Sequence, residues 1–217
     1  MLEVSPQMIL TSLWETLYMV SISLVFGTLI GVPLGILLVV TRKGHILENR
    51  WIFAIVNPIV NIFRSIPFII LLVAIIPFTR FVVGTSIGTT AAIVPLVLHI
   101  GPYMSRLVEN SLLEVDDGII EAAKAMGASP VQIIFRFLIP EAFPSLLLSI
   151  TTVTIGLIGA TAMAGAIGGG GLGDLAITYG YQRFSTITIV VTVVILVLIV
   201  QGIQSLGNLL ERKMRRV

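Results

Sequence analysis

The chain has 217 residues, of which 56% are hydrophobic and 11% charged, and its formal net charge is +2. A soluble domain carries about 25% charged residues, so this chain has too few polar groups to cover a globule in water. It has no cysteine, which excludes disulfides and thiolate metal sites. We therefore expect an all-α integral membrane protein, whose helices cross the bilayer in apolar runs of roughly 20 residues.

The first such run covers residues 17–40. Glu3 stands where a cleavable signal would carry positive charge, and no cleavage site follows, so we expect the run to be retained behind an external segment of residues 1–16. Pro33 predicts a kink in this helix. Three glycines recur every four residues on one face and predict the close approach of another helix, with chance placement as the alternative: Gly27, Gly31 and Gly35.

The second run, residues 51–78, follows a short polar turn in which His45 is expected to be solvated. Asn57, Asn61 and Arg64 share one face if the helix is continuous between them. A charge held inside the membrane usually faces protein or a water-filled cavity, so this face is expected to look inward. A structural role, in which a buried Arg64 binds carbonyl groups freed by Pro67, fits the pattern equally well.

The third run, residues 87–107, contains His99, which has no second ligand nearby and is interpreted as an interior histidine whose hydrogen bonds are satisfied. Arg106 leads out of this run towards a charged, helix-forming segment, residues 114–140. In that segment Asp116 and Asp117 predict a helix start, and Gly127 predicts its left-handed end.

A second helix is predicted to begin directly after that glycine. Ser129, Pro130 and Gln132 have the spacing of a capping box with proline at the first helical position, and Pro140 and Pro144 are expected to interrupt the chain beyond it. The segment is thus a short helix, a glycine corner and another helix.

The fourth run, residues 146–167, is rich in glycine and alanine, with Met163 as a bulky exception. The glycines at 168–173 follow no strand, so they are not a dinucleotide-binding motif, and we expect them to open into an external loop of residues 174–185. The fifth run, residues 187–203, is expected to face lipid, and the chain closes with a basic tail.

Positive charge predicts the orientation of these runs. With the N-terminus outside, ten lysines and arginines fall in inner segments and only Arg80 and Arg183 in outer ones. The segment of residues 114–140 and the C-terminus are therefore expected in the cytoplasm.

Glu121-Ala122-Ala123, followed by Gly127 and by Ile139-Pro140, resembles the EAA loop of the membrane subunits of bacterial ABC importers. Residues 61–88 and 168–184 are similar to the methionine-importer branch of that family. The resemblance implies a type I ABC importer permease fold over residues 17–209, with five transmembrane helices and a cytoplasmic two-helix coupling loop, followed by a tail of residues 210–217.

The function that the resemblance implies is that of a permease subunit in the inner membrane, which imports D- or L-methionine, or a related solute, by alternating access. The coupling helix would dock on a separate ABC ATPase dimer, which binds ATP and Mg, so this chain would be no enzyme and hold no cofactor. A second copy, an extracytoplasmic substrate-binding protein or lipoprotein, and the lipid bilayer are the other implied partners. The ATPase-coupling candidates are Glu121, Ala122, Ala123, Lys124, Ala125, Met126 and Gly127, and the pathway or gate candidates are Asn61, Arg64, Ser65 and Met163.

Other interpretations stay open. The same architecture serves other solutes, such as a phosphonate, a sulfonate or an osmoprotectant. An intramembrane serine protease would need Ser65 beside His99, without a nucleophile motif, and a channel would leave the coupling helix without a purpose. Residues 114–140 are also compatible with a plain surface loop or a helix-turn-helix, but only Lys124 and Arg136 would meet phosphate there, so no nucleic acid partner is expected.

Overall fold

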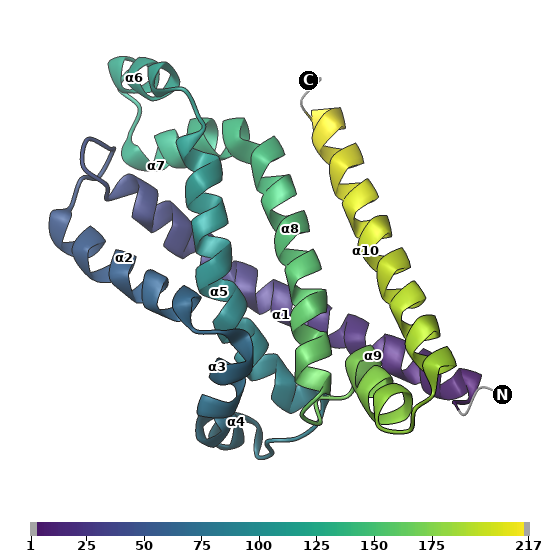
Figure 1. Cartoon of the computed structure of the whole chain (residues 1–217). Helices are drawn as coiled ribbons and strands as arrows, with labels where there is room; N and C mark the ends of the chain where they lie inside the picture. The colour runs from purple at the N-terminus through teal and green to yellow at the C-terminus, as the bar shows by residue number, and fades with distance from the viewer. Residues whose placement is uncertain (1–3, 215–217) are drawn as a thin grey trace.

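The computed structural model describes residues 4–214, which form helices and no strands, as expected for an all-α protein. In chain order these are α1 (Pro6–Val40), α2 (Arg50–Ser65), α3 (Phe68–Ala74), α4 (Ile76–Val83), α5 (Thr89–Leu113), α6 (Asp117–Ala125), α7 (Pro130–Gln132), the π-helical η1 (Ile133–Leu138), α8 (Ile139–Gly165), α9 (Gly171–Asp174), the π-helical η2 (Leu175–Tyr181) and α10 (Thr186–Met214) (Figure 1).

Among the described residues, four helices are long and apolar enough to cross a membrane: α1, α5, the continuous helix Pro130–Gly165 and α10. A fifth candidate is α2 together with α3, which are bent by 99° at the break between them. The predicted second run is thus not one straight span. Pro67 lacks an N–H and restricts Ile66 to an extended backbone, so the helix ends at Ser65 and restarts at Phe68.

The first helix begins at Pro6, well before the predicted run. Ser5 caps it by accepting a hydrogen bond from the backbone N–H of Met8 at 3.2 Å. Pro33 lies inside α1 without ending it. The segment expected to precede the span is therefore largely helical where the structure describes it.

The three glycines of α1 form the predicted contact face, and the helix that approaches it is α5. An added Cβ at Gly31 would lie 2.6 Å from the Cβ of Met104, and one at Gly35 would lie 2.7 Å from the Ser105 carbonyl oxygen. Only glycine permits this spacing between the two backbones.

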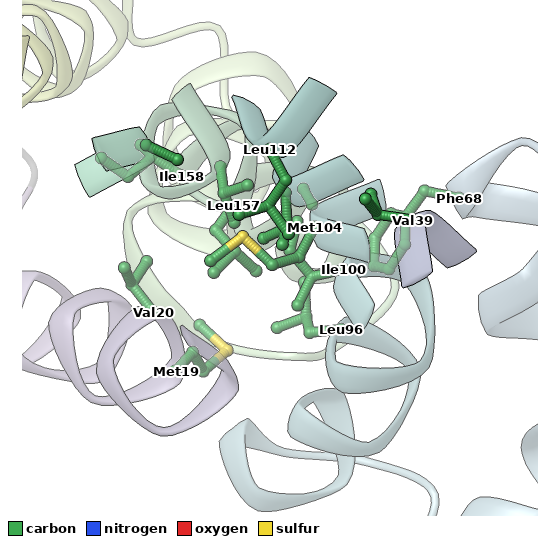
Figure 2. Close-up of a cluster of buried hydrophobic side chains, with 14 of the residues drawn as sticks. Met19, Val20, Val39, Phe68, Leu96, Ile100, Met104, Leu112, Leu157 and Ile158 are labelled. Atoms are coloured by element: carbon green, nitrogen blue, oxygen red, sulfur yellow. The ribbon is translucent and has the colours of Figure 1, made fainter. Parts of the chain in front are cut away.

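α5 lies at the centre of the helices. It packs against α1, α2, α3, α4 and α8. In its most apolar stretch of 18 residues 56% of the residues are buried, whereas in the corresponding stretch of α10 only 11% are. Figure 2 shows Leu96, Ile100 and Met104 of α5 among Met19 of α1 and Leu157 of α8. The expectation that the last helix faces lipid agrees with this small buried share.

The helix after the glycine corner runs without interruption from Pro130 to Gly165. Neither Pro140 nor Pro144 ends it, contrary to the expected interruption. The π-helical η1 ends at Leu138, two residues before Pro140, and there the N–H of Ile139 bonds to the Ile134 carbonyl, five residues back. This wider turn carries the chain past the proline.

Residues 174–185 were expected as a loop but are mostly helical, as η2 continues α9. Two residues of α1 secure the start of this helix: Glu15 Oε2 accepts from the Gly171 N–H at 2.7 Å, and Thr16 Oγ1 accepts from the Leu172 N–H at 2.8 Å. These contacts join segments 156 residues apart, which a local pattern does not reveal.

The last helix also continues beyond its predicted end. α10 extends to Met214, so the first part of the expected basic tail, including Arg212 and Lys213, is its final turn. Arg215 and Arg216 lie outside the described residues.

Candidate functional sites

The two-helix loop is built as its capping residues predict. Asp116 accepts from the Gly118 N–H at 2.8 Å and begins α6, which Gly127 follows with a positive φ of 78°. Ser129 and Gln132 form both halves of a capping box, with bonds of 2.8 and 3.4 Å. These bonds satisfy the orphan donors at the starts of both helices, so the corner between them is fixed by local chemistry.

One face of α6 is anchored and the other is free. Ile120 and Ala123 are buried, and α6 packs against η1. The other coupling candidates are exposed, with Met126 at 70%. They are Glu121, Ala122, Lys124, Ala125, Met126 and Gly127. The helix lies at the edge of the molecule (Figure 1), where a partner can reach it.

The loop between α1 and α2 lies beside this helix. A polar cavity of about 280 Å³ separates them, lined by Lys43 and His45 from the loop and by Asp117, Glu121 and Lys124 from α6. Burial lowers the pKa of His45 from 6.5, Asp117 opposes the shift, and Arg42 and Lys124 add to it. His45 is thus half-buried against α6, not a fully solvated loop residue as predicted.

The pathway candidates lie on two helices. Arg64 is exposed near the end of α2, with no hydrogen bond among the described residues, so the alternative of a buried Arg64 bound to freed carbonyls is not what this chain shows. Ser65 Oγ donates to the Asn61 carbonyl at 2.8 Å. Met163 is 51% exposed on α8. On the same helix Gly156 and Gly159 have open space where a Cβ would stand.

Arg106, which we expected at the inner end of the third run, forms a charged cluster among the helices, because α5 continues beyond that run to Leu113. Arg106 lies within α5 and donates to the Glu109 carboxylate, and also to the side-chain oxygens of Asn57 and Asn61 on α2, the latter at 2.9 Å. Arg42 approaches Glu109 at 4.0 Å. The spacing of Arg106 and Glu109, three residues apart on an apolar helix, was the sequence signal for this pair.

The protease interpretation finds no support in the geometry. Ser65 is hydrogen-bonded within its own helix, and the His99 ring packs against Phe68 with 5.1 Å between the ring centroids. No hydrogen bond joins the two, and His99 Nδ1 is buried with no partner in the described part of the chain, so the prediction that this histidine is satisfied is wrong. In the part of the chain that the structure describes, no group of three acidic, cysteine or histidine residues has a geometry that would hold a metal ion.

A set of membrane-length helices, with a short capped helix exposed at one end, is typical of a polytopic membrane protein. Residues 27–216 match the family model of the binding-protein-dependent transport system inner membrane component, so the chain belongs to that family.

Within this family, the chain is similar to proteins named as D-methionine permeases. The chain is 49% identical to the probable D-methionine transport system permease protein MetI of Vibrio cholerae, over 97% of this chain and 93% of that one. It is 54% identical to the D-methionine permease MetI of Escherichia coli K12 over 73% of each chain. The resemblance to methionine-importer permeases is thereby confirmed.

Solved structures of ABC transporters have chains with the same fold as this one. A chain of the MetNI methionine ABC transporter in an inward-facing conformation matches with a TM-score of 0.94 and 49% identity, over 97% of this chain and 99% of that one. A chain of an amino acid ABC transporter crystallised with histidines matches with a TM-score of 0.78 at 19% identity, which shows a shared fold alone.

Proposed function

We propose that this chain is the membrane-spanning permease subunit of an ATP-driven importer for D- or L-methionine or a close analogue. The observation that carries the proposal is the 49% identity, over 97% of the chain, to a protein named as a D-methionine permease. The TM-score of 0.94 against a chain of a methionine ABC transporter supports it.

The proposed topology has five spans, with α2 and α3 together as the second. The loop before α2, α6 and the described end of α10 lie at one end of the molecule, and α4 and α9 lie at the other (Figure 1). Lysines and arginines gather at the first end, which is therefore cytoplasmic, with the N-terminus outside and the C-terminus inside. The bias does not depend on Arg106, which belongs to α5 and not to a loop.

α6 is the proposed coupling helix. Its small residues, Ala122 and Ala125, give a slim exposed face that fits a cleft, while Glu121 and Lys124 can form ion pairs at the rim. A separate ATPase subunit binds ATP and Mg and works as a dimer, so two copies of this chain pair around a two-fold axis. An extracytoplasmic binding protein delivers the solute, which passes between the copies along Asn61, Arg64, Ser65 and Met163.

Transport proceeds by alternating access. Closure of the ATPase pair draws the two α6 helices together. The helices attached to them then open the route between the two copies towards the outside. Hydrolysis reverses the change. The energy comes from the different nucleotide affinities of the two states, as any such coupling requires.

The test is uptake of labelled methionine by the reconstituted complex, together with ATP hydrolysis. Gly127→Arg and Glu121→Lys should leave membrane insertion intact but separate hydrolysis from uptake. Gly84→Arg is the matched control for backbone strain, because Gly84 has a similar positive φ of 81° and open space around it. It ends α4, which lies at the opposite end of the molecule from α6 (Figure 1). Normal uptake by a well-expressed Glu121→Lys, Gly127→Arg double variant would disprove the docking role. Uptake of a phosphonate, sulfonate or osmoprotectant instead of methionine would reassign the solute.

A further inference from the structure

The helix that carries most pathway candidates is held in place by very little packing. Of the 16 residues of α2, only Val60 is buried. An apolar cavity of about 220 Å³ lies between α2, α1 and α5, lined by residues such as Ile30, Phe63 and Leu98. With so few buried side chains on α2, van der Waals contact alone sets its position weakly.

Hydrogen bonds from Arg106 hold α2 against α5 where few side chains pack between them. Arg106 of α5 donates from one terminal nitrogen to the Asn57 carbonyl at 3.2 Å, to the Asn57 side-chain oxygen, and to the Asn61 side-chain oxygen at 2.9 Å. Its other terminal nitrogen donates to Glu109, which is 3% exposed. We call these four residues the Arg106 clamp.

The clamp lies among the helices, near the end of α5 that leads to α6. Arg106 is seven residues before the end of α5, or about 10 Å along the helix axis, and its side chain is 15% exposed. Its Nε is buried without a hydrogen-bond partner in the described part of the chain, so the two terminal nitrogens determine where the guanidinium sits. A lysine cannot reproduce this arrangement, because its single ammonium lacks the planar fork that reaches two helices at once.

We infer that Arg106 is a positioning residue for transport: by binding Asn57 and Asn61 it sets the angle of α2 against α5, and with it the place of Arg64 and Ser65. The inference rests on the proposed function, since it gives these residues a transport role. Arg64 follows Asn61 by one helical turn, and the bend at Pro67 comes directly after. A change in the angle of α2 therefore moves the side chains just before the bend.

The test separates this role from plain stabilisation. Removing Arg106 alone would leave the buried Glu109 carboxylate with only the longer contact to Arg42, at 4.0 Å, and could unfold the chain. The double variant Arg106→Met, Glu109→Gln removes both charges at once. The asparagines then lose their donor, and Arg42, whose side chain is 45% exposed, loses its 4.0 Å contact with Glu109. Asn57→Leu is the complementary variant, because it keeps the Arg106 and Glu109 pair and removes one acceptor on α2.

A matched control breaks another polar link of α5. The hydroxyls of Ser111 on α5 and Ser149 on α8 lie 2.9 Å apart, and α2 takes no part in that contact. The Ser111→Ala, Ser149→Ala variant should keep the number of methionines imported per ATP hydrolysed.

Uptake and ATP hydrolysis are measured on the reconstituted complex, with its melting temperature. We expect the double variant and Asn57→Leu to assemble with the ATPase but to import fewer methionines per ATP, by about ten-fold in the double variant, within the usual range of coupling between sites. A wild-type ratio in both, or an equal loss in the serine control, would overturn the inference. If the wild-type complex imported no methionine, the proposed function would fail instead.

Discussion

Replacement of Gly31 by alanine tests the contact between α1 and α5. The new Cβ would lie 2.6 Å from the Met104 Cβ and 2.7 Å from the Gly101 carbonyl oxygen. A backbone oxygen cannot turn aside as a flexible side chain can, so the two helices have to separate. Overpacking of this kind costs about 1–3 kcal/mol, and alanine returns roughly 1 kcal/mol of helix propensity. Because the clash involves a backbone oxygen, we expect the upper part of that range, about 2–3 kcal/mol, and hence a net loss of about 1–2 kcal/mol.

The measurement is the melting temperature of the purified chain in one detergent at one scan rate. For a chain of this size the loss corresponds to a fall of about 2–8 °C. Gly202→Ala is the control, because Gly202 lies on the exposed side of α10 with nothing within 4 Å of an added Cβ, and it should melt at or above the wild-type temperature. If Gly31→Ala melted no lower than Gly202→Ala, the two helices would not be in the close contact described.

Three further predictions concern other parts of the chain. Thr16→Ala or Glu15→Ala should release the start of α9, at a cost of about 1 kcal/mol each as for a lost helix cap. Hydrogen exchange in residues 171–181 should then be faster. Thr11→Ala is the control, because Thr11 is exposed on the same helix and bonds only within it, and it should leave that exchange unchanged. Because the pKa of His45 is lowered in the folded chain, the unfolded chain binds the proton at a higher pH than the folded chain does. The neutral His45 therefore contributes its full stability above pH 6.5, and this contribution is lost as the pH falls towards the folded-state pKa. His45→Gln should reduce the fall of melting temperature with pH in that range, and an unchanged slope would contradict the prediction. Arg64→Met should alter methionine uptake without lowering the melting temperature, since Arg64 is exposed and has no hydrogen bond among the described residues; a joint loss of expression and stability would indicate a structural role.

The features that the sequence predicted well depend on residues that lie close together in the chain. The helix caps at Asp116 and Ser129 depend on residues two or three positions away, and the glycine spacing of α1 is a property of one helix face. Such features need no knowledge of which helices become neighbours. Apolar run length likewise located the spans, although not the ends of α1 and α10.

The misses share a physical cause, which is contact between distant segments. Arg106 was predicted only to lead out of the third run, yet its partners Asn57 and Asn61 come from a helix nearly 50 residues away. Glu15 was not singled out because its partner, the Gly171 N–H, lies 156 residues along the chain. The bend at Pro67 shows the limit of composition, since a proline signals a break but not its angle.

The way α6 is attached indicates which helices move together when a partner pushes on it. At one end α6 follows α5 after only three residues, and at the other it joins the continuous helix Pro130–Gly165 through the corner at Gly127. Those two helices are also joined sideways, by the hydrogen bond of Ser145 to Glu114 at 2.7 Å and by the packing of buried side chains such as Leu157 of α8 against those of α5. The glycine face of α1 adds a third helix, because close backbone contact leaves it no freedom to slide. We therefore expect α1, α5 and α8 to respond to α6 as one body. α2 has one buried residue and the Arg106 clamp to hold it, so it is the helix whose angle to that body can change at the least cost in packing.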